Sequence, residues 1–409
     1  MAAKLIVQKY GGTSVGDVKR IEAVAERIIS YAKKGHKLAV VVSAMGDTTD
    51  ELIELSQKIN PDPSDREMDM LISTGEQISS ALLAMAIHKR GLEAISFTGS
   101  QVGIITDKYH TKARILKIET DRIKKELDSN KVVIVAGFQG KSIHSEITTL
   151  GRGGSDLSAV ALAVALGADV CEIYTDVEGI YTADPRIVHD AKKLRYITFD
   201  EMLELAARGA QVMQTRAVEV GKKFNMPIYV RSSFSKKEGT IIMDKMPRIE
   251  EAVVRGVALA ENEAKITVCD VPDKPGLAAT IFTDLAKQNV NVDMIVQNVS
   301  HKKMTDISFT VPKATLTKSL KIARKISDKI GAGDVVYDEN IAKVSVIGVG
   351  MRSQSGVAAK CFSSLADNKI NIEMISTSEI SISCVVKKDL GKDALRVLHK
   401  TFELDKIKG

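Results

Sequence analysis

The sequence of 409 residues lacks tryptophan and is poor in aromatic residues, which make up 4% of the chain. Side chains on which nucleic-acid bases could stack are therefore scarce. Cysteine is sparse as well: Cys171, Cys269, Cys361 and Cys384 lie far apart and form no CxxC pair. This spacing argues against a zinc site and a disulfide framework, and it fits a reducing cytoplasm.

Long apolar runs are also missing. The longest, at residues 159–168 and 132–138, are well short of the roughly 20 residues that cross a bilayer. The N-terminus has no basic segment that leads into an apolar run with a small-residue cleavage site. We therefore expect no export signal and no membrane span.

The histidines do not point to a metal site, and the net charge does not point to nucleic-acid binding. The seven histidines form no HExxH-like pair, so we assign no metal ligand in the chain. The formal charge is +6, but lysines alternate with acidic residues instead of forming a basic stripe. We expect a soluble protein that does not bind nucleic acid.

The first 245 residues alternate short apolar runs with amphipathic stretches, as in a mainly parallel sheet covered by helices on both faces. Apolar residues recur at three- and four-residue intervals over residues 18–34 and 67–88, which predicts helices there. Six strands are predicted, at residues 5–9, 38–43, 94–98, 132–136, 170–175 and 227–231. We expect one α/β domain over residues 1–245.

Beyond this domain the chain repeats itself. The segment that starts at Ala264 aligns with the segment that starts at Ala342, a period of about 80 residues, and Gly276 matches Gly356. Each copy has the pattern strand, glycine turn, helix, strand, strand, helix. We predict two α+β units of βαββαβ type, at residues 263–338 and 340–409.

The first strand is followed by KYGGTSVGD, residues 9–17. Two adjacent glycines let the backbone turn tightly and bring its N–H groups close to an anion, and Lys9 would add a cation beside a transferred phosphoryl group. An ordinary glycine-rich turn with a solvated lysine explains this segment equally well on its own.

A second glycine turn, TTLGRGGSD at residues 148–156, opens onto an apolar helix. Ser155 or Asp156 would cap that helix, and Arg152 suits a bidentate grip on a carboxylate or phosphate. A third segment, YTDVEGIYTADPR at residues 174–186, follows a strand, where ligands bind in open α/β sheets. A structural cap and a polar turn are the competing interpretations.

These three segments resemble the signature segments of aspartate kinases in the amino acid kinase family, and the repeat resembles the paired ACT domains of those enzymes. No GxxxxGK[ST], HRD, DFG or GxGxxG motif points to another nucleotide fold. The resemblance implies an αβα sandwich followed by two ACT domains. It also implies transfer of the γ-phosphoryl group of ATP to the β-carboxylate of L-aspartate, the first step toward lysine, threonine and methionine.

The resemblance further implies which residues bind the substrates. Arg152 would pair with the α-carboxylate of aspartate, Glu76 with its ammonium group, and Thr49 would hydrogen-bond it. The aspartate set is Thr49, Glu76, Arg152, Gly153, Gly154 and Ser155. The ATP set is Lys9, Tyr10, Gly11, Gly12, Ser43, Ser155, Thr175, Asp176, Tyr181, Thr182, Ala183, Asp184, Pro185, Arg186 and Gln211.

One segment departs from the family pattern. Many relatives have lysine where this chain has Gln211, in GAQVMQTRA, so a charged contact from this position is in doubt. Lys9 and Arg152 remain the expected catalytic residues. The carboxylate nucleophile is already ionised at neutral pH, so charge neutralisation by Mg²⁺, Lys9 and backbone N–H groups is the main requirement. The metal is expected on nucleotide oxygens and water, with no protein ligand.

The ACT-like units would bind an amino-acid effector, for which we expect lysine, with threonine as an addition. The candidate effector residues are Asp273, Lys274, Gly276, Leu277, Asn291, Asp293, Gln297, Val357, Ala358, Asn371, Ile372, Glu373, Ser378 and Glu379. Because such units pair side by side, we expect a homodimer or larger assembly. An internal start near Met243 or Met246 that makes a separate regulatory subunit stays open.

Two other functions compete with this one. A kinase of another small carboxylate or of a nucleoside monophosphate would have similar ATP turns, but it would not need Thr49, Glu76, Arg152 and the repeat together. A non-catalytic amino-acid sensor would not need Lys9, Arg152 and the complete YTADPR loop.

Overall fold

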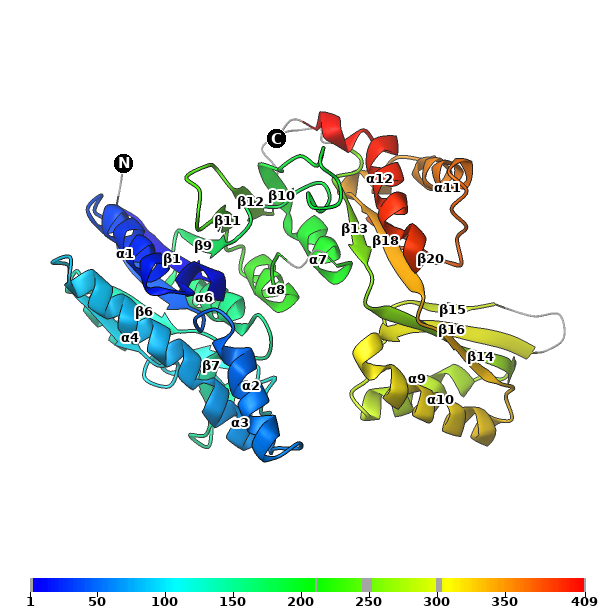
Figure 1. The fold of residues 1–409 in the computed structure, drawn as a ribbon, viewed down its shortest axis with the longest axis horizontal. Helices are drawn as coiled ribbons and strands as arrows, with labels where there is room; N and C mark the ends of the chain where they lie inside the picture. The colour runs from blue at the N-terminus through cyan, green and yellow to red at the C-terminus, as the bar shows by residue number, and fades with distance from the viewer. Residues whose placement is uncertain (1–2, 210–211, 245–251, 299–303, 408–409) are drawn as a thin grey trace.

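The computed structural model describes residues 3–209, 212–244, 252–298 and 304–407. It has two lobes, a larger one formed by the N-terminal part of the chain and a smaller one formed by residues from β13 onward (Figure 1). The expected fold class is confirmed: a mainly parallel α/β sheet is followed by two antiparallel sheets.

An eight-stranded sheet forms the centre of the large lobe. All its neighbouring strands are parallel except β11 and β12. Its strands, in spatial order, are β10 (Tyr196–Thr198), β12 (Thr240–Met243), β11 (Ile228–Ser232), β9 (Val170–Thr175), β1 (Leu5–Tyr10), β2 (Lys37–Val42), β6 (Val132–Ala136) and β3 (Ala94–Phe97). The six predicted strands are therefore all members of one sheet.

Helices cover both faces of this sheet, because its central strands are apolar on both sides: every residue of β6 is buried. The helices of one face are α1 (Val18–Ala32) and α4 (Thr74–His88). Those of the other face are α5 (Asp121–Asp128), α6 (Gly154–Leu166), α7 (Phe199–Ala207) and α8 (Thr215–Lys223). A small sheet of β5 (Ile115–Ile118), β4 (Ile104–Thr106), β7 (Gln139–Ser142) and β8 (Ile147–Thr149) flanks them.

The helix predicted at residues 67–88 is broken. It forms α3 (Asp65–Ile72) and α4, which meet at Ser73, and α2 (Thr48–Ile59) precedes them. The Ser73 carbonyl accepts a hydrogen bond of 2.7 Å from the Gln139 side chain, which supports the interruption. By length and composition alone Asp65–His88 could cross a membrane, but 50% of its apolar window is buried, as in a core helix.

The sequence repeat folds into two similar units. The first contains β14 (Glu263–Pro272), α9 (Leu277–Lys287), β15 (Ile295–Gln297), β16 (Met304–Pro312), α10 (Leu316–Ile330) and β17 (Val335–Asp338). The second contains β18 (Ile341–Ile347), α11 (Val357–Asp367), β19 (Met374–Thr377), β20 (Ser381–Lys387) and α12 (Gly391–Thr401). Gly276 and Gly356 precede α9 and α11 at φ 92° and 88°, a left-handed conformation that favours glycine.

One strand of the second unit's sheet comes from a segment that precedes the first unit in the sequence. The fourth strand of the second sheet is β13 (Gly256–Ala260), which lies before the first unit in the chain and pairs with β18. The predicted interval 340–409 thus contains three of the four strands of this sheet. The second unit, to which β13 belongs, shares a hydrophobic cluster with the large lobe.

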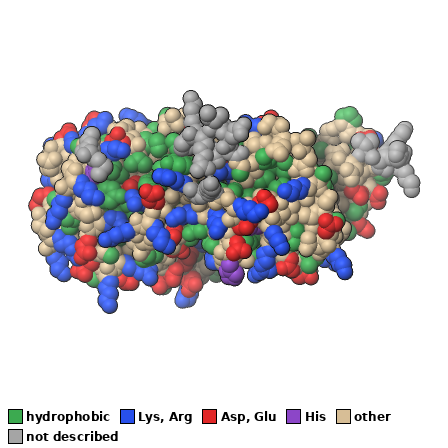
Figure 2. Space-filling model, turned by 90° about the horizontal axis from the view of Figure 1, so that it is seen from above, with side chains coloured by type: hydrophobic (Ala, Val, Ile, Leu, Met, Phe, Trp, Pro, Cys, Tyr) green, Lys and Arg blue, Asp and Glu red, His purple; other side chains and the backbone are tan. Residues whose placement is uncertain are grey.

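The lobes share a hydrophobic core. Ala183 and Val188, from the loop after β9, pack with Val257, Leu395 and Leu398 of the second unit. The buried Thr182 hydroxyl lies 2.9 Å from His399 Nε2 of α12. On the face seen in Figure 2, basic and acidic side chains are interspersed.

Candidate active site

A cavity of about 540 Å³ opens at the carboxyl ends of β1 and β2, the edge of a parallel sheet at which ligands bind. It brings together residues of the first two glycine segments with residues of α2, α3 and α4. Its lining contains Lys9, Gly12, Ser43, Ala44, Gly46, Thr49, Asp50, Ile53, Met68, Ile72, Glu76, Thr111, Phe138, Thr149, Gly151, Arg152, Gly153, Gly154 and Ser155.

The first glycine turn is packed too closely for a side chain. A Cβ on Gly12 would lie 2.9 Å from the Ala44 carbonyl oxygen. The turn continues into the short 3-10 helix η1 (Gly12–Val15), and Gly11 N–H donates to the Tyr174 carbonyl over 3.2 Å. The Tyr10 ring is fully buried and stacks on Tyr174, so its side chain faces away from the cavity.

Lys9 forms an ion pair with Asp156 in the cavity wall. The Nζ–Oδ1 distance is 2.7 Å, and both side chains are largely buried. The expectation that Ser155 or Asp156 caps α6 is wrong: Gly153, at φ 71°, holds the N-cap position. Asp156 is instead a site residue that the sequence analysis missed, although its place directly after GGS was the available signal.

Arg152 extends from the second glycine turn, where Gly151 and Gly153 have positive φ. Its side chain is 92% exposed, and Nη2 lies 3.2 Å from Asp50 Oδ1 across the mouth of the cavity. Asp50 was also missed, since it is distant in sequence from Arg152. The pair is well hydrated and weak, so a ligand carboxylate could replace Asp50 at low cost.

Glu76 is buried in the same cavity, which removes the alternative of a solvated helix face. Burial raises its pKa to about 7. Oε1 accepts a hydrogen bond of 3.2 Å from Ala44 N–H, while Oε2 has no hydrogen-bond partner within the described parts of the chain. An unpaired buried carboxylate oxygen is costly unless a ligand donates to it.

The third segment lies outside the cavity lining. Thr175 donates to Asp176 over 3.0 Å, and Arg186 is exposed and pairs with Asp184 at 2.7 Å. Thr182 and Ala183 are buried against the second unit. The backbone of Tyr181 forms an isolated antiparallel β-bridge with that of Lys193. Pro185 lies within the same segment, and Gln211 is outside the described residues.

Comparison with known proteins identifies the relatives of this chain. The amino acid kinase family model matches residues 4–232, and two ACT domain models match residues 265–329 and 344–402. The chain is 51% identical to the aspartokinase of Pseudomonas aeruginosa over 403 residues, with 98% of each chain covered. It is 51% identical to the aspartokinase of Corynebacterium glutamicum over 405 residues, which cover 98% of this chain and 96% of the relative.

The chain belongs to the aspartate kinase family.

Two solved structures of E. coli aspartokinase III are similar to this chain over nearly its full length. Aspartokinase III of E. coli in complex with aspartate and ADP, an R-state, has a TM-score of 0.83 at 25% identity, with 97% of this chain and 99% of that chain covered. The T-state of that enzyme, with lysine and aspartate bound, has a TM-score of 0.76 at 26% identity, with the same coverage. As an aspartate kinase with two ACT domains, the chain is an ATP-dependent enzyme of amino-acid biosynthesis under allosteric regulation.

In this aspartate kinase, several candidate effector residues already have partners. Asp293 pairs with Lys343 of the second unit, and Glu373 pairs with Lys265 of the first. Asp293 and Glu373 are equivalent in the repeat, as are Lys265 and Lys343. The two ion pairs are therefore reciprocal across the duplication.

Only the first of these pairs reaches the kinase domain within the described structure. Arg208, at the end of α7, donates to Asp293 over 3.1 Å and to Glu204 over 3.2 Å.

The other candidate effector residues form no hydrogen bond or ion pair with the side chains of this pair in the described structure. Glu379 pairs with Arg352, and Ser378 Oγ lies 2.9 Å from Ser381 Oγ. Gln297 is the last residue of β15. The other candidates lie around the starts of α9 and α11 or just before β15 and β19: Asp273, Lys274, Gly276, Leu277, Asn291, Val357, Ala358, Asn371 and Ile372.

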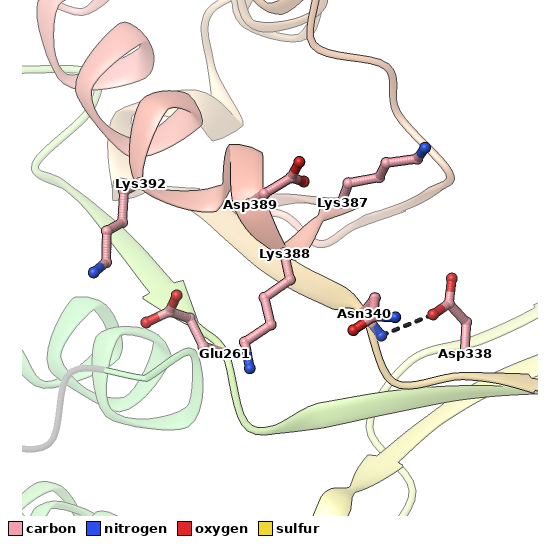
Figure 3. Close-up of a pocket in the computed structure, with 7 residues that line it drawn as sticks. All are labelled: Glu261, Asp338, Asn340, Lys387, Lys388, Asp389 and Lys392. Carbon is pink, nitrogen blue, oxygen red and sulfur yellow. Dashed lines mark hydrogen bonds between the residues drawn. The ribbon is translucent and has the colours of Figure 1, made fainter.

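A larger cavity of about 710 Å³ lies between the two regulatory units (Figure 3). Its lining includes three lysines and three acidic residues but no glycine turn, in contrast to the kinase cavity. The lining residues are Glu261, Asp338, Asn340, Lys387, Lys388, Asp389 and Lys392. Basic and acidic side chains are thus equally numerous in this lining.

Proposed function

We propose that the kinase cavity binds L-aspartate beside ATP and transfers the γ-phosphoryl group to the β-carboxylate, giving 4-phospho-L-aspartate. This proposal rests on Glu76 Oε2, a buried oxygen without a hydrogen-bond partner in the described structure, in the same cavity as Arg152 and Lys9. Glu76 would take the ammonium group of aspartate, Arg152 its α-carboxylate, and Thr49 would donate a hydrogen bond. The R-state complex of E. coli aspartokinase III with aspartate and ADP supports this pair of ligands.

The nucleotide would lie over the first glycine turn, with its phosphates against Lys9, Gly11 and Gly12. Ser43, Ser155, Thr175, Asp176 and the loop 181–186 complete the proposed ATP site. Since the side chains of Thr182 and Ala183 are buried elsewhere, their contribution would come from the backbone or from holding the loop in place.

The proposed reaction needs no general base, because the attacking carboxylate is ionised at neutral pH. Electrostatic repulsion between aspartate and the triphosphate is the obstacle. Lys9, held by Asp156, supplies positive charge at the transferred group, and glycine N–H groups supply aimed donors. In-line placement of the two substrates supplies much of the remaining acceleration.

Magnesium would enter with ATP as part of the substrate. No group of three or more His, Cys, Asp or Glu residues suited to a metal ion occurs in the described ranges. Phosphate oxygens and water, which Mg²⁺ prefers, would then complete its coordination. Its chemistry is to neutralise charge on the phosphates.

Feedback inhibition by lysine, with threonine as an additional effector, is the proposed regulation. The lysine-bound T-state of E. coli aspartokinase III supports it, as do the glycine turns that open α9 and α11. Gln297→Ala should raise the lysine concentration for half inhibition by roughly 5-fold or more. Unchanged inhibition in this variant would remove Gln297 from the effector site.

The proposed assembly is a cytoplasmic homodimer or larger oligomer, in keeping with four free cysteines and with edge strands in both regulatory sheets. A separately translated regulatory subunit would be an additional component of this assembly. Met243 closes β12 of the large lobe, and Met246 lies outside the described residues.

The test is to trap the acyl phosphate with hydroxylamine. Purified protein, MgATP and L-aspartate should give aspartyl hydroxamate, whereas L-glutamate should give little, because its longer side chain would not fit between Glu76 and Lys9. Equal product from glutamate would favour a kinase of another carboxylate. Absence of product from any acceptor, with ATP and lysine still bound, would favour an amino-acid sensor.

A further inference from the structure

Asp69 of α3 is a fully buried carboxylate just behind the acceptor side of the cavity. It does not itself line the cavity, but Met68 and Ile72 of the same helix do. A buried carboxylate with no function is expensive unless strong hydrogen bonds compensate for its desolvation.

Four hydrogen bonds converge on Asp69 from two other segments. The Thr149 hydroxyl donates to Oδ1 over 2.6 Å, and Thr111 N–H is 3.1 Å from both carboxylate oxygens. The His110 ring nitrogen Nδ1 donates to Oδ2 over 2.7 Å. Asp69 thus joins α3 to the loop between β4 and β5 and to the end of β8.

Both threonines bonded to Asp69 line the cavity. Thr111 has φ 62°, a left-handed conformation that is unfavourable for a β-branched residue and persists only where neighbours hold it. The hydrogen bonds from Thr111 N–H to Asp69 stabilise this backbone conformation. A Cβ built on Gly151 would lie 3.2 Å from the Thr111 carbonyl oxygen, so the strained residue packs directly against the turn that carries Arg152.

A second set of bonds ties the same two segments together. Ala113 N–H donates to the Thr149 carbonyl over 2.9 Å. Arg216 of α8 donates to the Leu150 and Ala113 carbonyls over 2.8 and 2.9 Å. The loop at 110–113 and the turn at 149–153 therefore form one wall, and Asp69 is its attachment to the helix that leads to Glu76.

We propose that Asp69 is a positioning residue for the phosphoryl acceptor, a small amino dicarboxylate. It sets the spacing between Arg152 on the wall and Glu76 on α4, the two groups assigned to the acceptor's carboxylate and ammonium. The inference rests on the proposed function through these two assignments. It has no bearing on the nucleotide turn, which Asp69 does not contact.

The test compares binding of aspartate and of ADP, each by calorimetry, with steady-state kinetics. Asp69→Asn should weaken aspartate binding and raise its KM by about tenfold to a hundredfold, because small displacements of binding groups are costly. ADP binding should stay within about twofold. Thr149→Val, which removes one of the four bonds, should give a smaller change of the same kind and covers the case in which Asp69 variants do not fold.

Glu172→Gln is the matched control. Glu172 is also buried and accepts hydrogen bonds from Gln8, Tyr31, Tyr174 and Arg231, but it is not part of the cavity lining. It should lose thermal stability without a selective change in aspartate affinity. If Asp69→Asn and Thr149→Val lower stability and weaken both ligands in parallel, as a purely structural residue would, the inference is overturned.

Arg152→Ala separates this inference from the function on which it rests. If Arg152→Ala weakens aspartate binding and the Asp69 and Thr149 variants do not, the positioning role alone fails. If Arg152→Ala leaves aspartate binding unchanged, the proposed acceptor site fails and the positioning role falls with it.

Discussion

At the scale of single residues, the Glu76 carboxylate links pH to substrate binding. Burial raises its pKa to about 7, so it is largely neutral in acid and ionised in weak base. Only the ionised form attracts an ammonium group. Aspartate affinity should therefore increase between about pH 6 and about pH 8, and calorimetry across this range measures it. A flat profile would contradict the role of Glu76.

The same burial makes Glu76 costly for folding. The folded-state pKa of about 7 exceeds the ordinary value of 4.5, so between these values the unfolded chain has lost a proton that the folded chain keeps. Stability therefore falls as pH rises through this window. Glu76→Gln should raise the free energy of unfolding at pH 8 by up to about 3 kcal/mol while it abolishes aspartate binding. Denaturant titration measures the first effect.

Asp156 offers a second test at this scale, because its carboxylate is the partner of Lys9 at 2.7 Å. Asp156→Asn should lower kcat by roughly tenfold to a hundredfold, since an undirected lysine no longer lies at the transferred group. The substitutions Asp156→Asn and Lys9→Ala should not be additive in the double variant. Additive losses would mean that the two residues act separately.

At the scale of elements, the reciprocal ion pairs of the regulatory units differ in one respect. Lys343–Asp293 continues through Arg208 into α7 of the kinase domain, whereas no described contact takes Lys265–Glu373 there. The Arg208–Asp293 contact ties the first regulatory unit to α7 of the kinase domain.

Arg208→Ala should make the enzyme more sensitive to lysine. Loss of Arg208 leaves Lys343 as the remaining cation paired with Asp293 in the described structure, which makes this carboxylate more available to an effector. Half inhibition should therefore occur at about two- to fivefold lower lysine. Lys265→Met breaks the equivalent pair without reaching α7 and is the control. Inhibition curves measure both variants, and equal shifts would deny Arg208 a special role.

At the scale of the whole molecule, exposed apolar side chains occupy equivalent positions in the two edge strands. Ile295 of β15 is 51% exposed and Ile375 of β19 is 42% exposed. Contact with a second copy of the chain would remove both apolar side chains from water. Ile295→Lys with Ile375→Lys should dissociate the proposed oligomer, as sedimentation velocity would detect. An unchanged sedimentation coefficient would place the interface elsewhere.

The sequence predicted those parts of the molecule that depend on local pattern. Apolar runs placed all six predicted strands, and the repeat revealed two units with equivalent glycine turns. The break at Ser73 could not be predicted, because Gln139, which binds the Ser73 carbonyl, is distant in sequence. Strand β13 was missed for the same reason, since its partner β18 follows an entire unit later.

The residues of the candidate site also fall into those that the sequence predicted and those that it did not. Lys9, Arg152 and Glu76 stand in recognisable segments, and the structure brings them into one cavity. Asp50, Asp69 and Asp156 were not assigned to the site, since their importance comes from partners that only the fold supplies. Sequence patterns indicate chemical groups, whereas the residues that hold those groups emerge from tertiary contacts.

The central claim, that a cation held between two anionic substrates drives the transfer, is tested most directly by kcat of Lys9→Ala. Lys37→Ala is the control, because Lys37 is exposed at the opposite end of the neighbouring strand and pairs with Asp128. We expect kcat for acyl phosphate formation to fall about 10²- to 10³-fold in Lys9→Ala, with a much smaller change in aspartate KM, and to be unchanged in Lys37→Ala. Wild-type turnover in Lys9→Ala would contradict the account.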